Sequence, residues 1–204
     1  MKPTPLLVVL LAFCFECNAQ TAVTPKELYE LGGVHYKKGS STPYTGKVIQ
    51  LFSSGKKMGE SNFKDGMPDG KAVIWFENGQ TDSIISWKAS KKHGPHLQWF
   101  KNGKKKLQGN WKDGKKHGAV VAWYENGNKQ MEGTYTDGKL DELLMTWFEN
   151  GQKQTQVRLK NGIHDGVSLG WHRNGTQAIA RLYKNGKQLS AKFWNSKGEP
   201  VDSL

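Results

Sequence analysis

The sequence repeats itself every 24 residues, and this period constrains the fold more than any other feature. The segment QWFKNGKKKLQGNWKDGK at 98–115 is matched by AWYENGNKQMEGTYTDGK at 122–139, with no gap between the two frames. A fixed period of this length is the signature of a tandem array in which each unit packs on its neighbours. One glycine column follows the period through the chain, and we expect its members to occupy turns: Gly55, Gly79, Gly103, Gly127, Gly151 and Gly175.

Further columns have the same period. A second glycine column, from Gly66 to Gly186, is broken by Ser90, and a third, from Gly46 to Gly166, is broken by Glu142. One aromatic column contains Phe63, Trp87, Trp111, Tyr135 and Tyr183, with Leu159 in the fifth unit. The other is a tryptophan column, formed by Trp75, Trp99, Trp123, Trp147 and Trp171.

Alternating apolar residues within each unit predict β-strands, since residues two apart on a strand share a face. Val73 pairs in this way with Trp75, and Ile85 with Trp87. We expect both pairs on one apolar face, with Lys, Gln, Thr and Ser on the other. The Asn-Gly dipeptides predict type I′ turns, which need positive φ at both central residues. The sequence therefore predicts an all-β fold, an elongated open antiparallel meander of tandem 24-residue β-hairpins.

The period also divides the chain. A lead-in segment at 20–45 precedes six hairpin repeats at 46–189, and a partial C-terminal end unit occupies 190–204. Residues 1–19 contain an apolar run of about ten residues, which is shorter than the roughly 20 that cross a bilayer. We expect a signal peptide cleaved near Ala19 and an exported protein, in the periplasm, the outer envelope or the extracellular space.

Both cysteines, Cys14 and Cys17, lie in this predicted signal peptide, so we expect a mature chain without disulfides. A lipid anchor on Cys14 is a less favoured alternative, because the preceding Phe13 is bulky. The formal net charge is +12. Such a surface favours anionic partners, and export would make nucleic acid the least expected of them.

Two surfaces are candidates for binding. The favoured interpretation of the tryptophan column is a core ladder in which side chains stack from unit to unit, and the alternative is a binding face for a partner. The lysine clusters are either solvated turn and edge residues or a basic edge for anionic lipid or polymer. The lysines of that predicted basic edge are Lys91, Lys92, Lys104, Lys105, Lys106, Lys115 and Lys116.

Nothing in the pattern indicates an enzyme, a metal site or a cofactor. His93 and His96 lack a third ligand at a convincing spacing. Glu77, Glu125 and Glu149 recur in one turn position, whereas a catalytic pair needs two different environments.

The segments FKDGMPDG at 63–70 and WKDGKKHG at 111–118 resemble the MORN repeat. With the added W-[FY]-E-N-G-Q element, the unit is similar to the bacterial MORN-variant arrays often described as YwqK-family antitoxin-like proteins. The resemblance implies an elongated, twisted sheet used for protein contacts, membrane apposition or scaffolding. The chain departs from the pattern at Ser90, Glu142, Ser190 and His172.

The leading functional hypothesis is a non-catalytic, secreted or envelope-located module that binds an unknown protein partner or acts as a scaffold. Binding of a polyanion or an anionic membrane is the first alternative, and an antitoxin-like role is the second. A homodimer is also open, because a second copy could cover an apolar sheet face.

Overall fold

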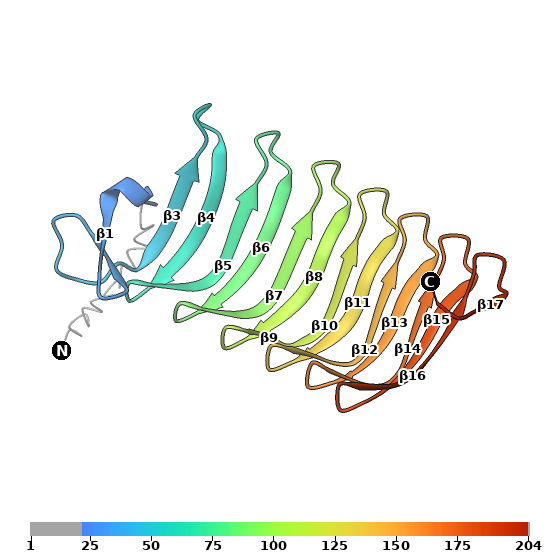
Figure 1. Ribbon diagram of the computed structural model, residues 1–204. Helices are drawn as coiled ribbons and strands as arrows, with labels where there is room; N and C mark the ends of the chain where they lie inside the picture. Colours follow the sequence, from blue (N-terminus) through green and yellow to red (C-terminus); the bar gives the residue numbers. More distant parts are fainter. Residues whose placement is uncertain (1–21, 204) are drawn as a thin grey trace, which may run out of the picture.

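The computed structural model describes residues 22–203, and the predicted signal peptide lies outside them. A 15-stranded antiparallel sheet, β3 to β17, forms one open, twisted layer (Figure 1). Each strand pairs with the next along the chain, except that β8 pairs with both the short β9 and β10, and this order confirms the predicted open meander. No helix within the described residues is long and apolar enough to cross a membrane.

The strands follow the 24-residue period closely. A 3-10 turn (Pro25–Glu27) leads into a small hairpin of β1 (Leu28–Leu31) and β2 (Val34–Lys37). The sheet then comprises β3 (Gly46–Leu51), β4 (Lys57–Lys64), β5 (Met67–Trp75), β6 (Thr81–Lys88), β7 (Lys91–Trp99), β8 (Lys105–Lys112), β9 (Lys115–Lys116), β10 (Gly118–Trp123), β11 (Lys129–Thr136), β12 (Lys139–Trp147), β13 (Lys153–Lys160), β14 (Ile163–Trp171), β15 (Gln177–Lys184), β16 (Lys187–Trp194) and β17 (Pro200–Val201).

The Asn-Gly turns are not type I′, contrary to the sequence prediction. Gly79 has φ +87, but Asn78 is not among the residues with positive φ. The amide of Gly79 donates to the Phe76 carbonyl, and the amide of Phe76 donates to the Gln80 carbonyl. This is a three-residue loop in which the glycine takes the left-handed position after a type I turn. Gly55, Gly103, Gly127, Gly151 and Gly175 also have positive φ, as expected for turn glycines.

Turns with positive φ at both central residues occur instead at the connections between units. Asp113 (φ 51) and Gly114 (φ 83) are both left-handed, as type I′ requires. Ala89 and Ser90 hold the same geometry without glycine. The third glycine column also has positive φ, and Glu142 keeps it at φ 66. Each glycine column therefore marks a left-handed backbone position.

The two aromatic columns lie on opposite faces of the sheet, so the prediction of a single aromatic face is wrong. Val73 is directly opposite Ile84, whereas Ile85 is opposite Ala72. Because neighbouring residues on a strand point to opposite faces, Val73 and Ile85 are on different sides. We name the side that carries the tryptophan column the Trp75 face. The side that carries Phe63, Trp87, Trp111, Tyr135 and Tyr183 is the Trp111 face.

The sheet has little enclosed core. Its single buried cluster among the described residues joins Val23, Tyr44 and Val48, with Leu28 and Phe63 packed against it. Val23 also bridges to Val48 on the edge strand β3, and the other end finishes with the short β17, which begins at Pro200. Both ends therefore carry features that discourage pairing with another chain.

Candidate functional site

On the Trp75 face, lysines lie over four of the five column tryptophans. The ammonium of Lys57 is 5.8 Å from the Trp75 ring centre, and that of Lys129 is 5.5 Å from Trp147. These distances are within the range of cation–π attraction. Each lysine precedes its tryptophan by 18 residues, so the contact repeats with the array. The other two pairs are Lys105 with Trp123 and Lys153 with Trp171.

Trp99 is the exception in this ladder, because Thr81 occupies the position where the other units have lysine. All five tryptophans are half-buried. Within residues 22–203 no two of them form a stacked pair, and lysines lie against four of the rings that we expected to stack on one another. The column is a mixed ladder of tryptophan and lysine.

Carboxylates neutralise part of the Trp75 face. Glu60 accepts from Lys47 at 2.7 Å and from Lys57 at 2.9 Å. These hydrogen bonds lower the pKa of Glu60. Glu132 likewise accepts from Lys129 at 2.7 Å. Of the four lysines over tryptophans, Lys57 and Lys129 are therefore balanced within the sheet, whereas Lys105 and Lys153 form no ion pair within residues 22–203.

The Trp111 face differs in this respect. The Lys92 ammonium lies 4.8 Å from the Trp111 ring centre and 5.8 Å from that of Trp87. Lys116 lies 5.0 Å from the ring centre of Tyr135. Neither lysine makes an ion pair with any residue in the described part of the chain. Two unbalanced cations thus stand among half-buried aromatic rings.

His96 lies between these groups. Its Nδ1 accepts a hydrogen bond of 3.4 Å from the Trp111 indole N–H. Burial lowers the pKa of His96, and the positive charges of Lys92 and Lys116 lower it further. The ring is therefore neutral at pH 7, and its buried Nε2 has no hydrogen-bond partner within residues 22–203.

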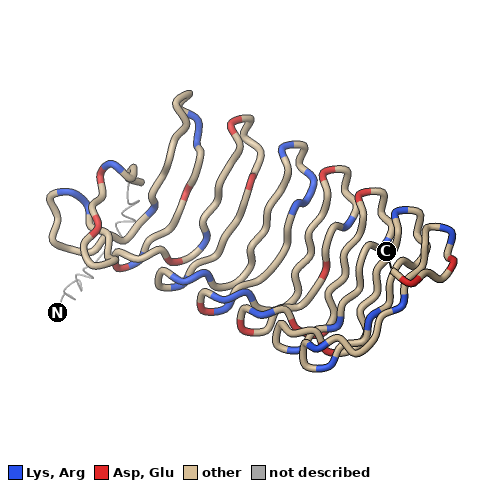
Figure 2. The backbone as a smooth tube through the Cα atoms, in the orientation of Figure 1, with Lys and Arg blue, Asp and Glu red and all other residues tan. Residues whose placement is uncertain are grey.

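The lysines of the predicted basic edge are divided between the two sides of the sheet on which the strands end in turns. Lys91, Lys92, Lys115 and Lys116 lie beside the two-residue turns, at the start of β7 and in β9. Lys104, Lys105 and Lys106 lie beside the three-residue loop at the opposite edge. Figure 2 shows lysine and arginine along both edges of the sheet. The structure therefore does not bring these seven lysines together.

The basic residues are nevertheless concentrated along the array. The unit at 94–117 has a single acidic residue, Asp113, and no other unit has as many basic residues. Its lysines are Lys101, Lys104, Lys105, Lys106, Lys112, Lys115 and Lys116.

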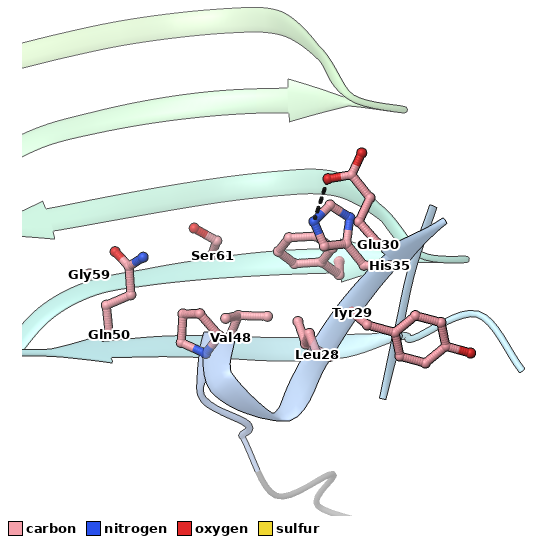
Figure 3. A pocket seen from close by; sticks show the side chains of 10 residues that line it. Leu28, Tyr29, Glu30, His35, Val48, Gln50, Gly59 and Ser61 are labelled. Carbon is pink, nitrogen blue, oxygen red and sulfur yellow. Dashed lines mark ion pairs between the residues drawn. The ribbon is translucent and has the colours of Figure 1, made fainter. Parts of the chain in front are cut away.

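A separate hollow of about 370 Å³ lies at the N-terminal end of the Trp111 face, where the β1–β2 hairpin covers the first unit (Figure 3). Val48, Gln50 and Ser61 form its floor. His35 and Glu30, 3.7 Å apart, stand at its wall. This hairpin covers the first unit, and no second layer covers β5 to β16 in the described structure.

The described residues contain no group of three or more His, Cys, Asp or Glu side chains that could hold a metal ion. His93 and Asp113 form an exposed pair, 3.2 Å apart. No hydroxyl or thiol nucleophile accompanies that pair or His96 in the hydrogen bonds of residues 22–203.

These features define a class of protein: an open, single-layer array of β-hairpin repeats with aromatic and basic residues on its surfaces. A family model described as the MORN repeat variant matches residues 92–113 and 116–142. The chain thus contains MORN-variant repeats, as the resemblance implied, and such repeats are consistent with a module for protein or membrane interaction. No curated protein matches the chain.

Sequence reasoning singled out the tryptophan column but did not recognise the group around His96. A signal was present. The position of His96 is apolar in most other units, which have Val48, Ala72, Val120 and Leu144 there. A polar residue in an apolar column marks a place where the array departs from its repeat.

Proposed function

We propose that this protein is a non-catalytic interaction module whose Trp111 face binds an acidic surface of a partner protein. The observation that carries the proposal is the pair Lys92 and Lys116, which lie over Trp111 and Tyr135 without a carboxylate partner among the described residues. Aromatic residues are enriched at the centres of interfaces, and complementary charge guides and orients association. On the Trp75 face, by contrast, Glu60 and Glu132 already balance lysines.

A homodimer through this same face is disfavoured on electrostatic grounds. In a dimer whose twofold axis passes through this cluster, Lys92 and Lys116 of one copy would lie against the same unbalanced lysines of the other. Like charges brought together at an interface cost free energy. The expected partner is therefore a different protein, with negative charge. Sedimentation of the purified chain tests this, and a dimer abolished by Trp111→Ala would refute it.

We further propose that the module acts outside the cytoplasm, on the basis of the apolar run between Leu6 and Phe15 and the short stretch that ends at Ala19. The antitoxin-like hypothesis is a special case of the main proposal, in which the acidic partner is a toxin protein.

Affinity capture with matched variants tests the main proposal. Wild type, Lys92→Gln/Lys116→Gln and Lys104→Gln/Lys106→Gln are immobilised and exposed to the same envelope extract. Both double variants remove two charges. The first also removes the cation–π contacts to Trp87, Trp111 and Tyr135, and the second removes the contact to Phe100. We expect one protein species to be retained by wild type and by the control, and lost by the Lys92/Lys116 variant. Equal retention by all three would refute the proposal.

A second candidate function is favoured by the lysine-rich unit at 94–117: binding of an anionic membrane or polymer through the lysines beside the turns at both ends of its strands, together with the adjoining Lys92. Vesicles of phosphatidylcholine with and without phosphatidylserine provide the test. Charge-driven binding should require the anionic lipid and weaken steeply with added salt. Here Lys104→Gln/Lys106→Gln should weaken binding as much as Lys92→Gln/Lys116→Gln, which separates this function from the first.

A further inference from the structure

A small cavity lies at Gly109, in the middle of the Trp111 face. In a row across the strands, His96 is opposite Gly109, and Val120 is opposite Gly133. Gly109 lies beside Val120, so the row has no side chain between the imidazole and the valine. The cavity has a volume of about 100 Å³, and its walls include Leu107, Trp111, Lys116 and Tyr135. We name it the Gly109 hollow.

The hollow is a local departure from the repeat. Other units have larger side chains at the position of Gly109, including Ile85 in the second unit and Val157 in the fifth. At Gly133, which is also small, Leu140 and Leu144 come within 3.3 Å of where a Cβ would stand and fill the space. At Gly109 the nearest atom to such a Cβ belongs to Val120, at 3.4 Å.

The described residues that line the hollow include several with hydrogen-bond donors, and none of them is acidic. The indole N–H of Trp111 can only donate, so Nδ1 of His96 accepts, and in the neutral ring the proton resides on Nε2. That Nε2–H is a buried donor with no acceptor in the described structure. A buried donor without a partner costs free energy. Lys116 also lines the hollow, with its ammonium over the ring of Tyr135, and Lys92 lies over Trp111.

We propose that the Gly109 hollow receives the carboxylate of a glutamate side chain on the acidic partner. A carboxylate supplies the negative charge that Lys92 and Lys116 lack, beside the buried imidazole of His96. The two methylenes of glutamate match the apolar walls formed by Leu107, Val120 and the Trp111 ring. This inference rests on the proposed function, since it names the group of the partner that the Trp111 face recognises.

Butyrate provides a direct probe, because it reproduces the glutamate side chain, and butyramide is its neutral isostere. Each is titrated into the full chain while the indole N–H resonance of Trp111 and the imidazole resonances of His96 are followed by NMR. We expect saturable shifts with butyrate and at least about tenfold weaker binding of butyramide, because a hydrogen bond to a charged group is the stronger one. Equal binding of the two would overturn the proposal.

Gly109→Val tests the cavity itself. Gly109 has an ordinary strand φ, and valine already stands at the same position in the fifth unit as Val157. We expect this variant to keep the fold and to lose butyrate binding, whereas Lys104→Gln/Lys106→Gln should bind butyrate as wild type does. If the Gly109→Val variant folds and still binds butyrate, the proposal that the Gly109 hollow is the carboxylate site is refuted.

The two proposals fail in different ways. If Lys92→Gln/Lys116→Gln abolishes capture of the partner and Gly109→Val leaves it intact, the interaction face is correct and the glutamate hollow is wrong. If Gly109→Val abolishes butyrate binding and no variant affects capture, the hollow is a carboxylate site and the partner proposal fails. A polyglutamate peptide tests both proposals together, with polyglutamine as its neutral control. Binding of polyglutamate alone to the wild type would support a glutamate-bearing partner on this face.

Discussion

The backbone conformation at Ser90 and Gly114 predicts opposite changes in the free energy of unfolding for Ser90→Gly and Gly114→Ser. Ser90 has φ 63 in a two-residue turn, and Gly114 has φ 83 at the same position one unit later. A left-handed conformation costs a residue with a Cβ about 1–2 kcal/mol. Glycine avoids this cost but loses about 0.5–1 kcal/mol more conformational entropy on folding. We therefore expect Ser90→Gly to raise the free energy of unfolding by about 0.5–1 kcal/mol, and Gly114→Ser to lower it by a similar amount.

The surroundings of both residues isolate this backbone effect. Ser90 is exposed, and its amide donates to the Pro68 carbonyl at 2.9 Å, as that of Gly114 does to Lys92. Neither substitution removes that bond, and a Cβ added at Gly114 meets no atom within 4 Å. Urea unfolding followed by tryptophan fluorescence measures the two changes, provided that the slope of the transition is unaltered. Changes of the same sign in both variants would refute the assignment of the cost to backbone φ.

Further predictions follow from the same structure. Glu142→Gly should stabilise the fold by about 0.5–1 kcal/mol, since Glu142 holds φ 66 where other units have glycine; urea unfolding checks it. Thr81→Lys should place an ammonium over Trp99 and add roughly 0.5 kcal/mol, which the same assay detects; no gain would show that the lysine ladder does not stabilise the sheet. Stability should fall as pH drops from about 6.5 through the lowered pKa of His96, because the unfolded chain then binds the proton more readily. His96→Gln should remove that step in a pH series of unfolding experiments. A second loss below about pH 4.5, as pH falls through the lowered pKa of Glu60, should be absent in Glu60→Gln.

Much of the fold was predictable because glycine reports directly on the backbone. The three columns that include Gly55, Gly66 and Gly70 recur at fixed spacing, and in the structure each is a left-handed position. The apolar alternation between them then defines the strands. The turn types were less accessible, because Asn-Gly suits both a two-residue type I′ turn and the end of a three-residue loop.

The assignment of faces failed for a different reason. A two-residue turn centred on Asn78 and Gly79 already pairs Val73 with Ile84, so counting outward from the turn would have placed Ile85 on the other side. The structure has this register, with an extra residue near the loop absorbed as a bulge. Apolar residues on both faces concealed it. A sheet with one solvated face shows a clean polar alternation, and this sheet does not.

The Gly109 hollow could not be predicted from columns alone. His96, Lys116 and Tyr135 belong to different columns, and they meet because register places three strand pairs side by side. Their relation depends on register shifts at the third glycine column, one between β6 and β7 and one where β8 changes its partner from β9 to β10. Such shifts are visible in coordinates but leave only a weak trace in sequence.

The absence of a second layer over most of the sheet explains why both faces combine aromatic rings with lysine. The side chains of Trp75, Trp123 and Trp147 remain half-buried, and the aliphatic part of each lysine shields the ring while its ammonium stays in water. On the Trp75 face this contact recurs in four units and is partly charge-balanced, as a structural device should be. Lys92 and Lys116 occur in two successive units on the other face, beside a cavity and an unpartnered imidazole nitrogen. A feature that stabilises an array should recur with its period, so this local and uncompensated cluster is better explained by recognition of a ligand than by stability of the sheet.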